Sequence, residues 1–506
     1  MGNWLFFRAA AAAAVLCLTM ASVAAPQDRP AAATGGRGRV RTPNRGPAGP
    51  VPRLSDGKPD LSGIWNGQQT INEKGEVIAT GPGSAPEPPP MLPWAAKVTA
   101  DRQANLSADD FEARCLPGTP PRIPPYHMSL FSTPNLVLML FEGNTHMYRQ
   151  FFVDGSSHPK NLKPTFYGDS RAHWEGDTLV VDTVGLNDIS WMDGRGHPHT
   201  TQMHLIEKFH REDYGNLTID VVIEDPGTFT KPWVMRRVTT LETGFEMTEY
   251  VCNENNQDPG HLDKAHASAA GAEQNKGYPN GVPPVPARKA PAPPSGPAPR
   301  TAEGKADFSG VWVVSGKTAL PSEPSYKPEF QAIYDQRKAA KGKGDPESFC
   351  LPDGAVRVTD LPYKIVQGPK MIVLLAEGNV HSYRRFFLDG RTQQAALDVE
   401  PETRSGISVG KWEGDALVVD TVGFDENTWL DSTGKPHSNA MHLTERYTRP
   451  DRGHLNVQIT IDDAKALTKP FTFTRVFTLA PAWELQEYVC QAVLDGVEPA
   501  PTTPLN

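Results

Sequence analysis

Long apolar runs and strong charge of one sign are both scarce in this chain of 506 residues. The one apolar stretch near membrane-spanning length lies at the N-terminus, in residues 9–20, which disfavours an integral membrane protein. The formal net charge is −9 and no long basic stripe appears, which disfavours a nucleic-acid binder. The hydrophobic fraction of 38% is still sufficient for packed cores, so the composition excludes a wholly disordered chain.

Familiar catalytic and metal-binding motifs are also missing. The chain contains no G-x-S-x-G nucleophile elbow, no P-loop and no dinucleotide-binding fingerprint. Of its five cysteines one lies near the N-terminus, and the other four include no C-x2-C pair. We therefore predict neither a structural metal nor a cofactor.

The N-terminus has the three parts of a secretory signal peptide. Arg8 ends a short first segment, the apolar residues 9–20 follow, and small residues at 22–24 supply a cleavage site. We expect residues 1–24 to be removed, which leaves no integral membrane segment. The mature protein is then predicted to be periplasmic or secreted.

The chain contains two copies of one unit. The longest match, Trp174–Gly185 with Trp412–Gly423, is identical at 11 of 12 positions. A unit of about 190 residues is too long for a solenoid repeat, so each copy is expected to be a domain. Five shorter matches keep the same order: Asp60–Trp65 with Asp307–Trp312, Cys115–Pro117 with Cys350–Pro352, Glu142–Arg149 with Glu377–Arg384, Pro198–Glu207 with Pro436–Glu445, and Glu249–Cys252 with Glu487–Cys490.

The repeat also indicates how the cysteines pair. Of the three possible pairings, Cys115–Cys252 with Cys350–Cys490 alone gives both domains the same bond. Export makes disulfides chemically permissible. Each bond would close a loop of about 140 residues, worth on the order of 4–5 kcal/mol in the loop-entropy model. Free or metal-bound thiols are the alternative.

Apolar residues at period two indicate strands. In Leu455–Ile461 and Phe471–Leu479, β-branched and aromatic residues alternate with polar ones, as is typical of half-buried antiparallel strands. Each copy has roughly eight to ten such segments and few helical ones, with one short helix expected at Gln331–Lys341. We predict an all-β fold of two tandem antiparallel β-barrels, closed or nearly closed.

The domain boundaries follow from the repeats and from composition. Gly277–Arg300 contains nine prolines in 24 residues, which is typical of a semi-rigid linker, so we expect the two barrels to unfold independently. The predicted segments are a signal peptide at 1–24, a disordered Arg/Pro/Gly-rich arm at 25–55, a first barrel at 56–257, a Pro/Ala-rich linker at 258–303, a second barrel at 304–495 and a disordered tail at 496–506.

Strand alternation places two arginines and two glutamates of each copy on faces that should point inward. An unpaired charge there would cost several kcal/mol, so pairing is expected. Two interpretations stay open: a structural ion-pair network, or a polar floor that grips the polar head of a ligand. The candidate ligand-binding residues are Arg149, Glu207, Arg237 and Glu249 in the first copy, and Arg384, Glu445, Arg475 and Glu487 in the second.

Three histidine positions recur in both copies. His204 and His442 fall on the polar face opposite Glu207 and Glu445, so this spacing does not converge on one metal centre. The other two positions are candidates for catalysis, because a Glu–His pair can act as a general base and a loop histidine is free to meet a ligand. A histidine hydrogen-bonded across a hairpin is the alternative for the Glu–His pair. The candidate catalytic residues are His146, Glu142, His199, His381, Glu377 and His437.

Two resemblances add to these patterns. The Cys-Leu-Pro, Trp-Glu-Gly-Asp-x-Leu-Val-Val-Asp-Thr and Pro-His-x4-His-Leu-x-Glu strings resemble an uncharacterised family of secreted bacterial proteins, which usually have one such unit, and imply no activity. Residues 63–65 and 310–312 look like the Gly-x-Trp that opens the first strand of lipocalin-like (calycin) barrels. Arg237 and Arg475 look like the arginine that packs over that tryptophan.

We therefore consider three functions. The first is an exported protein that binds a small apolar or amphipathic molecule inside its barrels. The second is a cofactor-free lipocalin-like enzyme, an isomerase, hydratase or lyase, acting on an apolar substrate. The third is a structural or interaction module of the cell envelope.

Overall fold

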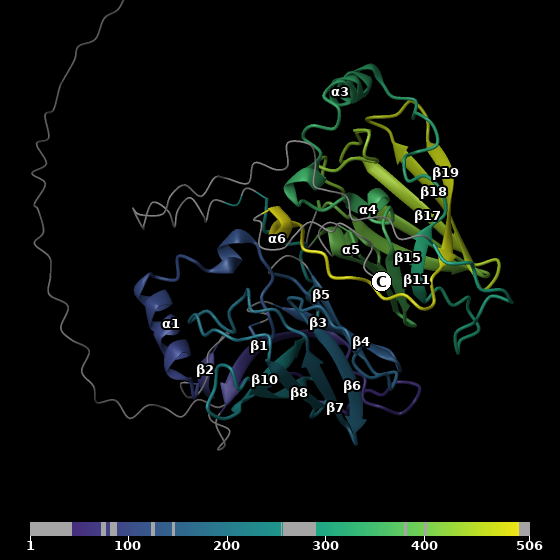
Figure 1. Ribbon diagram of the computed structural model, residues 1–506. Helices are drawn as coiled ribbons and strands as arrows, with labels where there is room; N and C mark the ends of the chain where they lie inside the picture. Colours follow the sequence, from purple (N-terminus) through teal and green to yellow (C-terminus); the bar gives the residue numbers. More distant parts are fainter. Residues whose placement is uncertain are drawn as a thin grey trace, which may run out of the picture. The chain divides into compact units, whose positions relative to one another are not determined.

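The computed structural model describes residues 43–71, 77–80, 89–122, 127–143, 147–254, 256, 290–378, 382–398 and 402–494. The prediction of an all-β chain with two barrels in tandem is confirmed, with the first barrel drawn in purple to teal and the second in green to yellow (Figure 1). The predicted signal peptide lies outside the described residues, as do His146 and His381.

The first barrel is a ring of nine strands. It is closed by the pairing of β1 with β10, while β2 pairs with β1 outside the ring. Its strands are β1 Gly63–Ile71, β2 Val77–Thr80, β3 Met128–Ser132, β4 Leu136–Phe141, β5 Tyr148–Phe152, β6 Asp169–Glu175, β7 Thr178–Val184, β8 His204–Arg211, β9 Asn216–Glu224 and β10 Trp233–Glu242.

The second barrel repeats this ring with nine strands and no counterpart of β2 among the described residues. Its strands are β11 Gly310–Val314, β12 Tyr363–Gln367, β13 Met371–Ala376, β14 Tyr383–Phe387, β15 Ile407–Glu413, β16 Ala416–Val422, β17 Met441–Thr448, β18 His454–Asp463 and β19 Phe471–Leu479.

One strand pair in each barrel is parallel, which differs from the antiparallel barrels predicted. These pairs are β5 with β6 and β14 with β15. A closed ring with an odd number of strands cannot alternate direction all the way round, so one neighbouring pair must run the same way. A long crossing connection joins the two parallel strands, and in the first barrel it comprises residues 153–168.

The helices lie outside the strand ladders. The predicted helix at Gln331–Lys341 is present as α3, Pro328–Ala339, and its counterpart α1, Pro93–Ala104, was not expected from the sequence. Both begin with proline, which suits the first helical turn because that position needs no N–H donor. Within the described residues no helix combines the length and apolar character needed to cross a membrane. The short helices are α4 Gly354–Arg357, α5 Gln393–Leu397 and α6 Cys490–Leu494, with 3-10 turns at Phe111–Arg114 and Pro346–Phe349.

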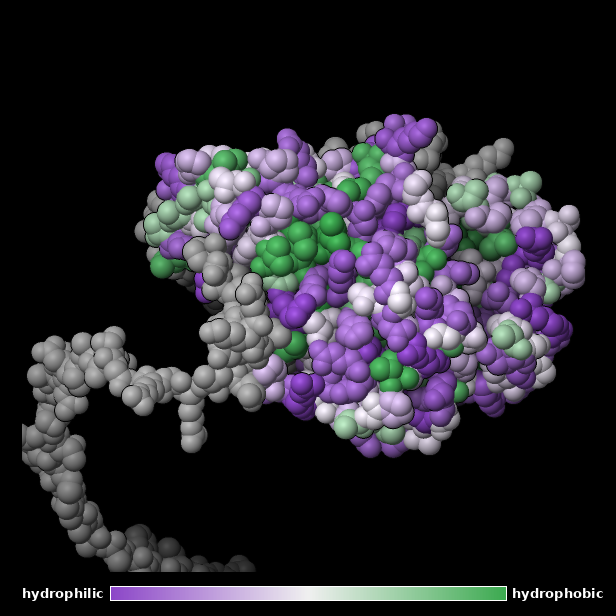
Figure 2. All heavy atoms as spheres, turned by 90° about the horizontal axis from the view of Figure 1, so that it is seen from below, coloured by the Kyte–Doolittle hydropathy of each residue, from purple (hydrophilic) through white to green (hydrophobic). Residues whose placement is uncertain are grey.

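Each barrel interior is filled by large side chains around a tryptophan of its first strand. Trp65 and Trp312 are both fully buried. Arg211 stacks on Trp65, 5.0 Å from the ring, and Arg449 stacks on Trp312, 4.9 Å from the ring. The assignment of this role to Arg237 and Arg475 is therefore wrong. On the outside, Figure 2 shows a face where hydrophobic residues form separate patches among hydrophilic ones.

Parts of the predicted arm and linker contact the barrels. Arg53 donates to Asp177 at 2.8 Å, and Arg300 makes the equivalent bond to Asp415 at 2.8 Å. Because the same ion pair precedes each barrel, the repeated unit includes these residues.

The two barrels share a hydrophobic cluster. It combines β3, β4 and β5 side chains such as Leu138 with β12, β13 and β14 side chains such as Val373. The Tyr148 hydroxyl donates to the Ala376 carbonyl at 3.1 Å, and the Tyr383 hydroxyl donates to the Phe141 carbonyl at 2.9 Å. Since this shared core would be exposed if one barrel unfolded alone, we no longer expect independent unfolding.

Candidate functional site

An equivalent polar network lies inside each barrel. In the first, Arg149 on β5 donates to the Glu207 carboxylate on β8 at 2.8 Å and to the hydroxyl of Thr183 at 3.3 Å. In the second, Arg384 donates to Glu445 at 2.7 Å and to Thr421 at 3.4 Å. Strand alternation predicted these four charged residues to face inward, and each is at most 6% exposed.

The network pairs each buried charge with an opposite charge. Each guanidinium has a carboxylate, a threonine and a serine as partners, the serines being Ser170 at 3.4 Å and Ser408 at 3.2 Å. Glu445 also accepts from the Tyr447 hydroxyl at 2.9 Å. Arg149 Nε and Arg384 Nε are buried without a hydrogen-bond partner among the described residues. Because each guanidinium charge already has a carboxylate, this geometry favours the structural interpretation.

The second inward arginine differs between the repeats. Arg475 on β19 lies 3.0 Å from the Asp360 carboxylate and donates to Thr359 and to two carbonyls, those of Val356 and Thr318. Burial raises the pKa of Asp360 from 3.8 to about 7, although Arg475 lowers it. Asp360 is therefore a counter-ion of Arg475 above pH 7 and a neutral neighbour below it.

Arg237 on β10 has no such carboxylate in the part of the chain that the structure describes. Its guanidinium donates to the Pro121 carbonyl at 2.8 Å and to the Met235 sulfur at 3.4 Å, and in the described part of the chain no carboxylate comes within 4.0 Å of it. Arg237 is 8% exposed, and burial lowers its pKa, with Glu207 and Asp193 opposing that shift from farther away. When the two repeats are aligned by sequence, Pro125 of the first repeat stands where the second has Asp360.

The walls around Arg237 are mostly apolar. Trp233 and Met235 lie on the same inward face of β10, and Phe229 packs 5.7 Å from the Trp233 ring. The indole N–H of Trp233 is buried and has no hydrogen-bond partner among the described residues. In the second repeat Phe471 stands in its place, which removes that donor. This part of the first barrel therefore combines apolar side chains with one indole donor that lacks an acceptor and one arginine that lacks a carboxylate among the described residues.

Glu249 and Glu487 do not lie inside the barrels, so the prediction that these two glutamates face inward is wrong. The Glu249 carboxylate accepts from the Arg404 backbone N–H at 2.6 Å, and Glu487 accepts from the Phe166 N–H at 2.6 Å. The strand predicted around each does not form, because β10 ends at Glu242 and β19 ends at Leu479. Each glutamate instead contacts the other repeat.

The recurring histidines that the structure describes are held by structural contacts. His199 and His437 are buried, and burial lowers the pKa of both, so both are neutral at pH 7. His437 is held between the Thr428 hydroxyl at 2.7 Å and the Ser438 carbonyl at 3.1 Å. His204 lies on the outer face, 2.7 Å from Asp182. Among the described residues no group of three His, Cys, Asp or Glu side chains could hold a metal ion.

Glu142 and Glu377 have partners among the described residues, whereas the expected histidines His146 and His381 lie outside them. The Glu142 carboxylate lies 2.8 Å from His127 Nδ1, and it accepts from the Thr248 N–H at 2.8 Å. Glu377 accepts from the Gln486 N–H at 2.9 Å. His127 also stacks on Phe245, with ring centroids 3.9 Å apart. Sequence repetition missed His127 because the second copy has a proline at its position.

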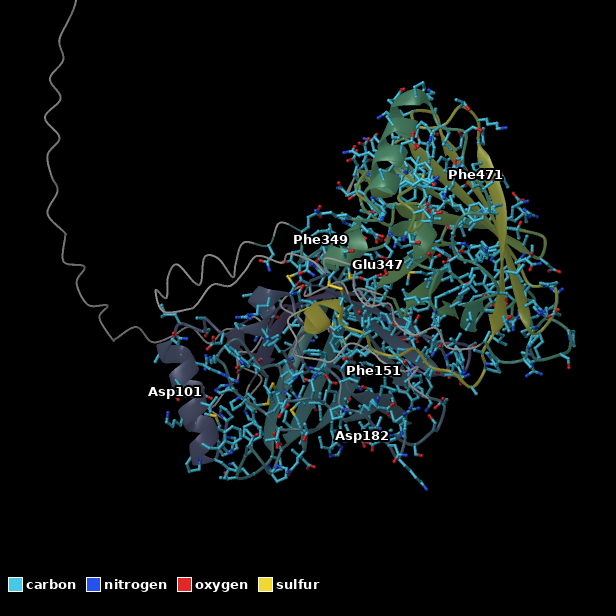
Figure 3. All side chains as sticks on the ribbon, turned by 45° about the horizontal axis from the view of Figure 1, so that its top comes forward. Asp101, Phe151, Asp182, Glu347, Phe349 and Phe471 are labelled. Atoms are coloured by element: carbon cyan, nitrogen blue, oxygen red, sulfur yellow. A yellow bond between two sulfur atoms is a disulfide. The ribbon has the colours of Figure 1, made fainter. Side chains whose placement is uncertain are left out.

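The disulfide prediction is confirmed. Cys115 pairs with Cys252 and Cys350 pairs with Cys490, and yellow bonds mark the pairs in Figure 3. Two such bonds are those expected outside a reducing cytosol. Each ties the segment after the last strand to its own barrel.

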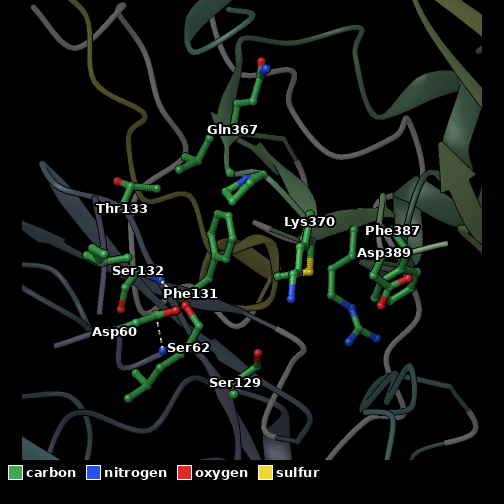
Figure 4. Close-up of a pocket in the computed structure, with 18 of the residues that line it drawn as sticks. Asp60, Ser62, Ser129, Phe131, Ser132, Thr133, Gln367, Lys370, Phe387 and Asp389 are labelled. Atoms are coloured by element: carbon green, nitrogen blue, oxygen red, sulfur yellow. Dashed lines mark hydrogen bonds between the residues drawn. The ribbon is translucent and has the colours of Figure 1, made fainter. Parts of the chain in front are cut away.

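A groove of about 1910 Å³ runs between β3 of the first barrel and β12–β13 of the second. In Figure 4, Phe131 projects into its centre, with Ser132 on one side and Lys370 on the other. Several of its charges neutralise each other, as in Arg391 with Asp389 at 2.7 Å and Arg385 with Glu246 at 3.0 Å. The groove therefore offers less electrostatic attraction for an anion than Arg237 does.

Asp360 was absent from the predicted site. It lies in a loop without alternation, but a residue-by-residue comparison of the repeats would have set it against Pro125. A search of protein-family models found no match to the chain, and a search of curated proteins found none either.

Proposed function

We propose that this is an exported binding protein, periplasmic or secreted, whose first barrel takes a small amphipathic anion. The ligand class is a carboxylic acid with an apolar body. Arg237 holds the carboxylate, and Trp233 and Met235 contact the apolar part. The second barrel supplies its own carboxylate, Asp360, to the equivalent arginine and leaves no such place.

One observation carries the proposal: Arg237 is a buried guanidinium that has no carboxylate partner among the described residues, while its counterpart Arg475 has one at 3.0 Å. Arginine stays protonated at any physiological pH, so its charge cannot be removed by burial. A buried charge without a partner costs several kcal/mol. A bound carboxylate offsets that cost and can form two parallel N–H···O bonds with the guanidinium.

Binding of octanoate and of its neutral analogue octanamide to the full chain tests the proposal by calorimetry. We expect octanoate to bind and octanamide to bind at least tenfold more weakly. Arg237→Gln should abolish octanoate binding. Arg236→Gln is the matched control, because the neighbouring Arg236 faces outward and pairs with Asp220. Equal octanoate binding by wild type and Arg237→Gln, or binding by neither, would overturn the proposal.

A second candidate is the cofactor-free enzyme. His127 favours it, because its ring lies 2.8 Å from Glu142 and 3.5 Å from Glu242, as a general base oriented by a carboxylate would. Phenylacetate incubated with the protein in D2O tests this candidate by NMR. Deuterium incorporation at the α-carbon that His127→Asn removes would support catalysis, and no incorporation by wild type would contradict it.

A further inference from the structure

The contacts between the two repeats follow a twofold pattern. Glu249 of the first repeat binds the Arg404 N–H and the Ser405 hydroxyl, and Glu487 of the second binds the Phe166 and Tyr167 N–H groups. Residues 166 and 404 are equivalent positions of the two repeats. Val489 and Ala492 of the second repeat also join the hydrophobic core of the first. Each repeat therefore uses the same surface against the other.

The polar contacts around this shared surface are not symmetric in residue type. On one side Lys364 donates to the Glu484 carboxylate at 2.8 Å and to the Gln150 side chain at 2.9 Å. On the other side Arg385 donates to Glu246 at 3.0 Å. Lys364 corresponds by sequence to Ser129, and Arg385 to Gln150. Arg391, which corresponds by sequence to Ser156, also donates to Glu246 at 2.6 Å and pairs with Asp389 at 2.7 Å. One side thus has Lys364 beside Glu484, and the other has Arg385 and Arg391 beside Glu246 and Asp389.

The same positions would be mismatched in a pair of like repeats. Two first repeats would place Ser129 and Gln150 beside Glu246 on both sides, with none of these cations present. Two second repeats would place Lys364, Arg385 and Arg391 together beside Glu484 and Asp389 on both sides. Charges left without partners in a partly buried interface, or placed beside like charges, oppose association. Only the pair of unlike repeats matches the number of these cations to the number of these carboxylates on each side.

We infer that the two repeats recognise each other and discriminate against copies of themselves. The surface of the first repeat fits one kind of partner, the second repeat, whether from the same chain or from another copy. A pair joined in this way uses both surfaces and leaves neither for further chains, so it is closed. This inference rests on contacts away from Arg237 and does not depend on the proposed function.

The full chain can test it after a protease site is placed in the Pro-rich linker at residues 277–289. No disulfide joins the repeats among the described cysteines, so cleavage leaves noncovalent contacts between them. Native mass spectrometry of the cleaved protein at decreasing concentration then measures its dissociation. We expect the wild-type halves to stay paired at micromolar concentration. Halves that separate there would overturn the inference.

Two half-swapped variants reproduce the like pairs within one chain. Lys364→Ser with Arg385→Gln and Arg391→Ser gives both sides the residues of the first repeat, and Ser129→Lys with Gln150→Arg and Ser156→Arg gives both sides those of the second. Each should raise the dissociation constant at least tenfold. The full swap of all six positions restores the match between cations and carboxylates and should return the dissociation constant to within about threefold of wild type. Half-swaps as tight as wild type, or a full swap as weak as the half-swaps, would contradict charge-based recognition.

Discussion

Glu207→Gln should remove a large share of the free energy that holds the chain folded. The substitution leaves Arg149 charged and buried, with side chains of the pair only 2% and 7% exposed. Two unit charges about 4 Å apart attract by about 4 kcal/mol at an effective dielectric constant of about 20. Breaking a buried pair on one side typically costs about 3–5 kcal/mol. Because glutamine keeps one oxygen for Arg149, we expect a loss of about 3 kcal/mol.

Urea denaturation followed by tryptophan fluorescence measures this loss as a change in the free energy of unfolding. Asp220→Asn is the matched control, since it breaks the exposed pair with Arg236, and exposed pairs are worth roughly 0–1 kcal/mol. Glu445→Gln should behave like Glu207→Gln, because Arg384 is held in the same way. A loss below about 1 kcal/mol for Glu207→Gln would refute the view that this pair stabilises the barrel.

Two further predictions concern the second barrel and the interface. The pKa of Asp360 is about 7 in the folded state against 3.8 for the ordinary group, so the fold binds its proton more tightly than the unfolded chain does. The stability that Asp360 contributes is therefore full below about pH 4 and is lost as the pH rises through 7, by up to about 1.4 kcal/mol per pH unit. Subtracting the free energy of unfolding of Asp360→Asn from that of wild type, both measured in urea at each pH, isolates this contribution. A difference that grows with pH would contradict the expectation. Calorimetry of the intact chain should give one unfolding transition, and Glu445→Gln should lower its midpoint temperature. Two transitions, of which Glu445→Gln lowers only one, would mean that the barrels unfold independently.

Alternation in the sequence located the barrel interior well. Arg149, Glu207, Arg384 and Glu445 lie on strands whose period-two pattern fixes the inward face, and the structure pairs them as expected. The disulfides followed from duplication, because within-copy pairing alone gives both repeats the same bond.

The same reasoning failed where the apolar partner belongs to the other repeat. Phe245 and Met247 alternate with polar residues around Glu249, but both pack in the cluster shared by the two barrels. Periodicity tells which side of a segment is buried and does not tell against which domain. Asp360 was missed for another reason, since loop residues carry no period and become informative only when the two repeats are compared.

The helix α1 was missed because its sequence looks unlike an amphipathic helix. Pro93 starts it after a Pro-rich stretch, and its buried side is small, with Ala95 and Thr99 as buried members. Such a helix is fixed by packing on the barrel more than by its own pattern.

The number of carboxylates bound per chain tests the central claim most directly. Asp360→Ala removes the internal partner of Arg475 and makes the second barrel resemble the first in this respect. Titration of the full chain with octanoate should then give two bound molecules per chain, against one for wild type. Adding Arg237→Gln to Asp360→Ala should return the number to one. A stoichiometry unchanged by Asp360→Ala and by Arg237→Gln would contradict the assignment of anion binding to the unpaired arginine.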